Sequence, residues 1–173
     1  MDREELIKRL RLLDNAVFGL SPHAGDRYSC VIVGGCAFLL LGYNGRATHD
    51  IDVIIHNLPS ALQGIMSGLD MNSIVRAYFD SFADDYLARV KPVPLDTKSV
   101  DFYTLSLEDL VISKIAAGRR QDKFDIFSGE VAQNIDWALL DALADEVKQS
   151  LLSSRQVQEF EGLYDEYVKG CKP

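Results

Sequence analysis

The sequence predicts an α+β fold, in which a small mixed β-sheet flanked by helices is followed by a helical C-terminal part. Two observations predict it. Short runs rich in β-branched and other apolar residues, such as Tyr28 to Val33 and Ile51 to Ile55, fall in the first two thirds of the chain. From Ser106 onward, apolar residues recur at intervals of three and four, which is typical of helices that pack by one face.

Composition and charge restrict the class of protein. The 173 residues are 47% hydrophobic and 25% charged, as in an ordinary globular protein. The formal net charge of −8 argues against binding nucleic acid by generalised attraction, which needs a basic face. A nucleic-acid partner would therefore need a local basic patch or bridging cations.

Cysteines and apolar runs point to a cytoplasmic protein without membrane contact. The three cysteines form no CxxC pair and have no histidine cluster nearby, which favours buried, reduced thiols over disulfides or a metal site. The N-terminal residues mix charged and apolar side chains and lack the apolar core of a signal peptide. The longest mostly apolar stretch, Cys30 to Leu41, is too short to cross a bilayer, which takes about 20 residues.

Periodicity and the positions of glycine and proline predict the elements of the first two thirds. The stretch Asn72 to Phe79 favours a helix, and Arg76 to Asp80 fits a strand as an alternative. The remaining expected elements are a helix from Arg3 to Phe18, a strand from Tyr28 to Val33, a short helix from Cys36 to Leu41, a strand from Ile51 to Ile55, a helix from Pro59 to about Leu69, and extended segments at Tyr86 to Val90 and Val100 to Leu105.

The last third reads as helices separated by capping residues. Ser106-Leu-Glu-Asp109 has the hydroxyl-to-acid spacing of a capping box, and Gly118 is a suitable stop for the helix that follows. Further helices are expected over Asp122 to Gln133, Asp136 to Leu151 and Ser153 to Lys169. We expect residues 1–27 to form an N-terminal helix and linker, 28–127 the core, and 128–173 C-terminal helices packed on it.

The Asp50-Ile51-Asp52 sequence at the start of the second main strand is the first candidate for chemistry. Residues two apart in a strand project from one face, so both carboxylates point the same way while Ile51 and Val53 face the core. Two adjacent carboxylates repel each other unless a cation lies between them. Mg²⁺, or Mn²⁺ in its place, suits such a ligand pair. Taken alone, the motif also fits two solvent-exposed acids near a turn.

The Gly34-Gly35 pair between the first strand and the next helix is the second candidate. Glycines there allow a phosphate to approach the backbone and to meet the amides at the start of the helix. A tight turn without a ligand would use the same residues. The order of the two motifs along the chain favours the functional interpretation. The glycine pair that would bind phosphate comes one helix and one loop before the strand that would bind the metal.

These motifs resemble the signature of the nucleotidyltransferase superfamily, and in particular of its AbiEii-type branch, many of whose members are toxins of toxin–antitoxin systems. The resemblance is carried by residues 31–35 (VIVGG) and 46–53 (RATHDIDV), then by a Ser-x-Lys-type helix and a basic stretch with two acids in residues 105–126. It implies a nucleotidyltransferase-like sheet. Lys114, which interrupts an apolar helical face, must either extend to solvent or meet an anion.

The resemblance implies a set of site residues. Asp50 and Asp52 would hold the metal, and Asp101 is the first candidate for a third carboxylate, followed by Asp80, Asp84 and Asp85. His49 is expected at the surface. The nucleotide-binding set would be Gly34, Gly35, Arg46, Thr48, Lys114, Arg119 and Asp122, with Lys114 also counted as catalytic.

The resulting functional hypothesis is a Mg²⁺-dependent transferase that moves a nucleoside monophosphate from an NTP to an acceptor hydroxyl. The acceptor would be tRNA or other RNA, a protein or a small molecule, and a toxin role would imply an antitoxin protein as partner. The alternative is a non-catalytic nucleotide-binding or protein-interaction module on the same fold. The transferase needs a general base, which a third carboxylate would provide, whereas the non-catalytic module does not.

Overall fold

The structure, a computed structural model, describes residues 1–20, 27–43, 49–55, 60–73 and 82–173. Its internal contacts divide the chain into two compact units. The sheet unit comprises residues 1–75 and 90–105, and the helical unit comprises residues 76–89 and 106–173. The expected fold class, a small mixed sheet flanked by helices with a helical C-terminal part, is confirmed. The expected boundaries at residues 27/28 and 127/128 remain a prediction.

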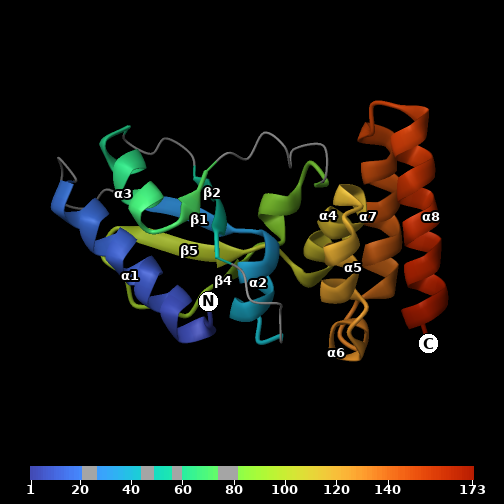
Figure 1. Ribbon diagram of the computed structural model, residues 1–173, viewed down its shortest axis with the longest axis horizontal. Coiled ribbons are helices and arrows are strands. Elements are labelled where there is room, and N and C mark those ends of the chain that lie inside the picture. Colours follow the sequence, from blue (N-terminus) through green and yellow to red (C-terminus); the bar gives the residue numbers. More distant parts are fainter. Residues whose placement is uncertain (21–26, 44–48, 56–59, 74–81) are drawn as a thin grey trace. The chain divides into compact units, whose positions relative to one another are not determined.

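The sheet unit is built on five strands in the order β3-β2-β1-β5-β4 (Figure 1). The central strand β1 pairs antiparallel with β2 and parallel with β5, while β3 pairs parallel with β2 and β4 antiparallel with β5. The inner strands are rich in apolar residues because they form the core of the unit. The bounds are β1 Tyr28–Ile32, β2 Ile51–Ile55, β3 Met71–Asn72, β4 Lys91–Pro92 and β5 Val100–Thr104.

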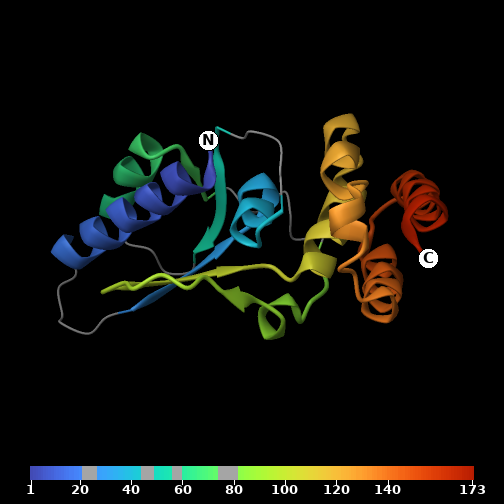
Figure 2. The same ribbon diagram turned by 90° about the horizontal axis from the view of Figure 1, so that it is seen from below.

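Helix α1 (Arg3–Leu20) lies along one face of this sheet (Figure 2). It buries the apolar stripe that its sequence predicts, made of Leu6, Leu10, Leu13 and Val17, each 1% exposed or less. Two shorter helices belong to the same unit: α2 (Gly34–Leu40) directly after β1, and α3 (Gln63–Gly68), which the 3-10 turn η1 (Ser60–Leu62) precedes.

One charged residue, Asp14, interrupts the buried stripe of α1 and is 4% exposed. Its carboxylate accepts hydrogen bonds from the backbone N–H groups of Lys98, Ser99 and Val100 at 2.8 to 3.1 Å. The carboxylate therefore satisfies three donors where β5 begins. A buried carboxylate is tolerated where hydrogen bonds replace its lost hydration, and here it attaches α1 to the start of β5.

The helical unit contains α4 (Leu107–Ala117), α5 (Arg120–Ile126), α6 (Gly129–Ala132), α7 (Trp137–Ser150) and α8 (Ser154–Cys171). Helix α4 is its core and contacts α5, α7 and α8. The expected cap and stop of α4 are confirmed: the Ser106 hydroxyl accepts the Asp109 N–H at 3.0 Å, and Gly118 follows with φ of +62°. Every residue from Leu107 to Ile115 is buried.

Two of the expected elements are wrong. Tyr86 to Val90 is not extended: a 3-10 turn, η3 (Tyr86–Ala88), forms there, and the buried Tyr86 ring packs 5.4 Å from that of Phe82. The expected helix from Asp122 to Gln133 is broken after Ile126, because the Ser128 hydroxyl accepts the N–H of Val131 and begins α6.

The choice between helix and strand for residues 72 to 80 is settled only at its start. Asn72 belongs to the short strand β3, and residues 74–81 lie outside the described residues. Asp80, one candidate for the third acid, is among them. Within the described ranges, no helix has both the length and the apolar character needed to span a membrane.

Candidate active site

The turn between β1 and α2 brings the glycine motif against a carboxylate. Gly34 has a φ of +65°, a left-handed conformation that glycine adopts without the steric cost of a side chain. A Cβ atom placed on Gly34 would lie 3.1 Å from Oδ2 of Asp52. The Val33 N–H also donates to the Asp52 carbonyl at 2.9 Å. The glycine thus lets the Asp52 carboxylate lie against the backbone of the turn.

Both acids of the Asp-x-Asp motif are held at this turn. Asp52 is the second residue of β2 and is half-buried, whereas its neighbours Ile51 and Val53 are fully buried, as the strand period predicts. Asp50 is exposed and immediately precedes the strand. Its carbonyl accepts a hydrogen bond from Sγ of Cys36 on α2 at 3.4 Å.

The thiol of Cys36 on α2 is affected by the negative charge near the turn. Burial raises the pKa of its thiol to about 12, and the negative charges of Asp52 and Asp50 add to the shift. The thiol is consequently protonated at neutral pH. Because the carboxylates disfavour a further negative charge beside them, this end of the sheet suits a cation or the cation-bridged phosphates of a nucleotide.

Of the other residues predicted near the site, the structure describes Gly35 and His49 but not Arg46 and Thr48. Gly35 is the second residue of α2 and half-buried, and Val33 at the N-cap position provides no side-chain hydrogen bond to the first turn. Arg46 and Thr48 lie outside the described residues. His49 is exposed, as expected for a surface residue.

Asp101 lies at the opposite end of the sheet from Asp52. In the β1–β5 register Asp101 is level with Ser29, whereas the backbone of Asp52 bonds to Val33, four residues further along β1. Four residues of strand and two strand spacings separate the two acids by roughly 16 Å, far beyond a shared metal ion.

Asp101 instead has its own partner. Arg27 donates to it from Nε at 2.9 Å and from a second guanidinium nitrogen, and this bonding lowers the pKa of the Asp101 carboxyl. The position on β5 level with Val33 is Leu105, which is fully buried. The structure therefore does not bring Asp101 to the Asp50 and Asp52 pair.

The donor set of the site is two carboxylates beside a glycine turn. In the described ranges, no group of three or more His, Cys, Asp or Glu side chains is arranged to hold a metal ion. Two carboxylates nevertheless fit Mg²⁺, which binds proteins through one or two carboxylates and completes its shell with water and substrate phosphates. The side chains present therefore fit the ion together with a nucleotide.

Lys114 forms a buried ion cluster within the helical unit. Its Nζ lies 2.6 Å from Oδ1 of Asp122 and 2.9 Å from Oδ2 of Asp125, both on α5. The side chains of Lys114, Asp122 and Asp125 are 7%, 1% and 6% exposed. Arg119 also donates from Nε to Asp122 at 2.7 Å.

The charges within this Lys114 cluster balance. Two cations, Lys114 and Arg119, face two carboxylates, Asp122 and Asp125. This balance favours a structural role for Lys114, joining α4 to α5, over a role as a phosphate clamp. The apolar helical face alone predicts that Lys114 needs an anion, but the identity of that anion depends on how α5 folds back.

A second ion cluster was not predicted from the sequence. Arg89 binds Asp109 of α4 through two nitrogens, each at 2.9 Å, and also bonds Asp85. Asp84 and Asp85, both candidates for the third carboxylate, belong to the helical unit, where the Arg89 contact lowers the pKa of Asp85. Nothing local in the sequence signals this pairing, because Arg89 and Asp109 are 20 residues apart.

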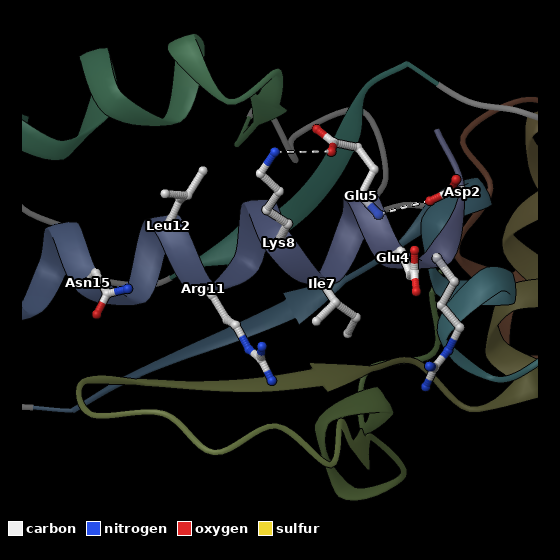
Figure 3. A pocket seen from close by; sticks show the side chains of 9 residues that line it. Asp2, Glu4, Glu5, Ile7, Lys8, Arg11, Leu12 and Asn15 are labelled. Carbon is white, nitrogen blue, oxygen red and sulfur yellow. Dashed lines mark hydrogen bonds and ion pairs between the residues drawn. The ribbon is translucent and has the colours of Figure 1, made fainter.

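A hollow of about 760 Å³ lies along the exposed face of α1 (Figure 3). Its charged lining residues are three acids and three bases from the first 11 residues, and Lys8 pairs with Glu5 across one turn at 3.9 Å. None of the predicted site residues lines it. A mixed-charge face on one helix is typical of a solvated surface, so we place the site at the glycine turn.

Comparison with known proteins identifies the family of the chain. Residues 8–172 match a family described as nucleotidyltransferase of unknown function (DUF6036), and the chain belongs to this family. No curated protein and no solved structure matches the chain.

Proposed function

We propose that this member of a nucleotidyltransferase family transfers a nucleoside monophosphate from an NTP to an acceptor hydroxyl, with Mg²⁺ or Mn²⁺ held by Asp50 and Asp52. The observation that carries the proposal is the approach of the Asp52 carboxylate to the Gly34 turn, 3.1 Å from the place a Cβ would occupy. Family membership supports the reaction class, and this geometry supports the choice of residues.

Each residue of the turn has a part in the reaction. The bound ion would neutralise charge on the phosphates during an in-line displacement. Asp50 and Asp52 position that charge beside the glycine turn. Because Gly34 and Gly35 carry no side chains, the phosphates can approach the amides at the start of α2.

The test compares two Asp→Asn variants in the same sheet. Asp52→Asn should lower the incorporation of label from an α-³²P-NTP and the release of pyrophosphate by at least about 100-fold, the scale seen when one group that stabilises developing charge is removed. Asp101→Asn is the matched variant, since it alters a carboxylate on β5 at the opposite end of the sheet. It should keep its activity and lose at most about 1 kcal/mol of stability, as expected for an exposed ion pair.

Two outcomes would contradict the proposal. Activity that persists in Asp52→Asn would exclude the assigned metal ligands. Loss of activity in a folded Asp101→Asn variant would mean that the third carboxylate is Asp101 after all. EDTA should abolish wild-type labelling, and Mg²⁺ or Mn²⁺ should restore it.

A second function is favoured by one specific observation, that the described residues supply two acids at the turn and no third. A fold that kept nucleotide binding and lost turnover would act as a binding or interaction module. Calorimetry that shows NTP binding, without pyrophosphate release for any RNA, protein or small-molecule acceptor, would favour the module.

The biological setting proposed is that of a cytoplasmic toxin with an antitoxin partner. It rests on the similarity of residues 31–53 and 105–126 to AbiEii-type proteins, a finer statement than family membership. Growth arrest on expression that depends on Asp52, with relief by a neighbouring gene product, would support it. Arrest that is equally strong in Asp52→Asn would contradict it.

A further inference from the structure

The stretch around α5 carries a concentration of positive charge in an acidic chain. Three cations fall within five residues, Arg119, Arg120 and Lys123, although the whole chain has a net charge of −8. The acids of the same stretch, Asp122 and Asp125, are buried and bind Lys114. Because Arg119 is paired with Asp122, Arg120 and Lys123 are the two cations that remain on the outward face of α5.

An exposed aromatic ring lies on this same face. Phe124 is 74% exposed. It lines a hollow of about 360 Å³ together with Phe127, Ser128, Arg120, Lys123 and Glu166. The second ring, Phe127, is fixed edge-on against Tyr167 with centroids 5.3 Å apart. The hollow thus brings two aromatic rings and two cations together on one surface.

The two cations of the hollow differ in their bonding. Nζ of Lys123 is held by Glu166 at 2.6 Å. Arg120 is exposed, and its guanidinium makes no hydrogen bond or ion pair with any part of the chain that the structure describes. A forked guanidinium beside an exposed ring is therefore open to a ligand that has both an anionic and a planar apolar part.

We propose that this α5 surface, formed by Arg120, Lys123, Phe124 and Phe127, binds a single-stranded polynucleotide. A base would stack on Phe124, and the adjacent phosphate would take the Arg120 guanidinium through paired hydrogen bonds. A duplex cannot do this, since its bases are already stacked on one another. An acidic peptide would use the cations but would give the exposed ring no partner.

On this acidic chain the surface offers a phosphate one cation, Arg120, that the described residues leave unpaired, and a second, Lys123, that Glu166 already binds. Strand binding itself is independent of catalysis. Its meaning as the recognition of a nucleic-acid acceptor rests on the proposed transferase function.

Binding is measured on the full chain by fluorescence anisotropy, with labelled single strands of about 12 nucleotides, within the range of known single-strand sites. RNA, DNA of the same sequence and an RNA duplex form the three arms. Phe124→Ala should weaken single-strand binding about 5- to 150-fold, the range for loss of one stacked base. Arg120→Ser should lower the slope of log K against log salt by about 0.7, the value for one phosphate contact on a single strand.

Matched controls remove an exposed apolar group and an exposed arginine elsewhere in the helical unit. Leu152→Ala removes a side chain that is 82% exposed, and Arg155→Ser lowers the net charge by the same amount as Arg120→Ser. Both should bind like the wild type. Thermal unfolding of all four variants checks that the fold is kept.

Binding of RNA alone supports the proposal and assigns RNA, and equal binding of DNA supports it for either strand. Duplex binding as tight as single-strand binding overturns it, as do wild-type affinities in Phe124→Ala and Arg120→Ser. A polyglutamate peptide whose binding depends on Arg120 but not on Phe124 would overturn it in favour of an acidic protein partner.

The Asp52→Asn variant separates this inference from the proposed function. It should bind the strand as the wild type does while losing transfer. A wild-type chain that transfers nucleotide but binds no strand would overturn only the α5 surface. A chain that binds strands in the expected way but transfers nothing would overturn only the transferase.

Discussion

Replacing Lys114 by methionine tests whether the buried Lys114 cluster is structural. Methionine keeps most of the side-chain volume and removes the charge. Lys114 bonds Asp122 at 2.6 Å and Asp125 at 2.9 Å, and neither carboxylate side chain is more than 6% exposed. The substitution would leave buried carboxylate oxygens without their cation.

The loss of stability in Lys114→Met depends on which hydrogen bonds Asp122 and Asp125 keep. Removing one partner of a buried ion pair costs about 3–5 kcal/mol, because the remaining charge stays desolvated. Asp122 keeps Arg119, whose Nε is 2.7 Å away, so Asp125 and one oxygen of Asp122 bear the loss. We therefore expect the lower end, a decrease of about 3 kcal/mol in the free energy of unfolding.

Urea unfolding followed by circular dichroism measures the change. With a slope of about 2 kcal/mol per molar, the midpoint should fall by about 1.5 M. The double variant Lys114→Met/Asp125→Asn should recover part of the loss, because it removes one orphaned charge. A Lys114→Met chain that unfolds like the wild type but no longer binds NTP would refute the structural reasoning and support a phosphate-binding lysine.

Two further substitutions test the sheet unit. Gly34→Ala should cost about 1–2 kcal/mol from its left-handed backbone and should also weaken metal-dependent NTP binding by displacing Asp52. Gly118→Ala, with a nearly equal φ of +62° and its nearest neighbour 3.9 Å from the added Cβ, should show the stability loss alone; equal NTP binding in both variants would contradict the role of the close approach. Asp14→Ala should lower the free energy of unfolding by about 3 kcal/mol or more, because it orphans buried N–H groups. The exposed helix cap Asp2, replaced in the same way, should cost only about 1 kcal/mol, and a similar cost at both acids would exclude the anchoring role of Asp14.

The core of the candidate site could be predicted because its signals are local. A strand that ends in two glycines fixes a turn, and an acid between two buried aliphatic residues fixes a face. Gly34 and Asp52 then meet because β1 and β2 are adjacent antiparallel strands. The helix caps at Ser106, Asp136 and Ser153 were predictable for the same reason, since each bond spans only two or three residues.

Features that depend on distant pairing could not be predicted in this way. Lys114 needed a partner, but its acids lie on the next helix, beyond a turn whose path the sequence does not determine. Arg89 and Asp109 show no local pattern at all. The two-residue strands β3 and β4 are too short for any periodicity to reveal.

Asp101 shows the limit most clearly, because its place in the sheet depends on the register of β5 against β1. Sliding β5 by four residues would keep every side chain on its own face and bring Asp101 level with Val33, but it would pair residues 28–31 of β1 with the polar residues 96–99. The observed register places the buried Val100 and Phe102 beside β1, and the buried Asp14 supports it by accepting hydrogen bonds from the N–H groups of residues 98–100 at the end of the sheet where Tyr28 pairs with Val100. A carboxylate on α1, more than 80 residues away in sequence, thus helps to hold Asp101 at the end of the sheet where it pairs with Arg27, away from Asp50 and Asp52 at the glycine turn.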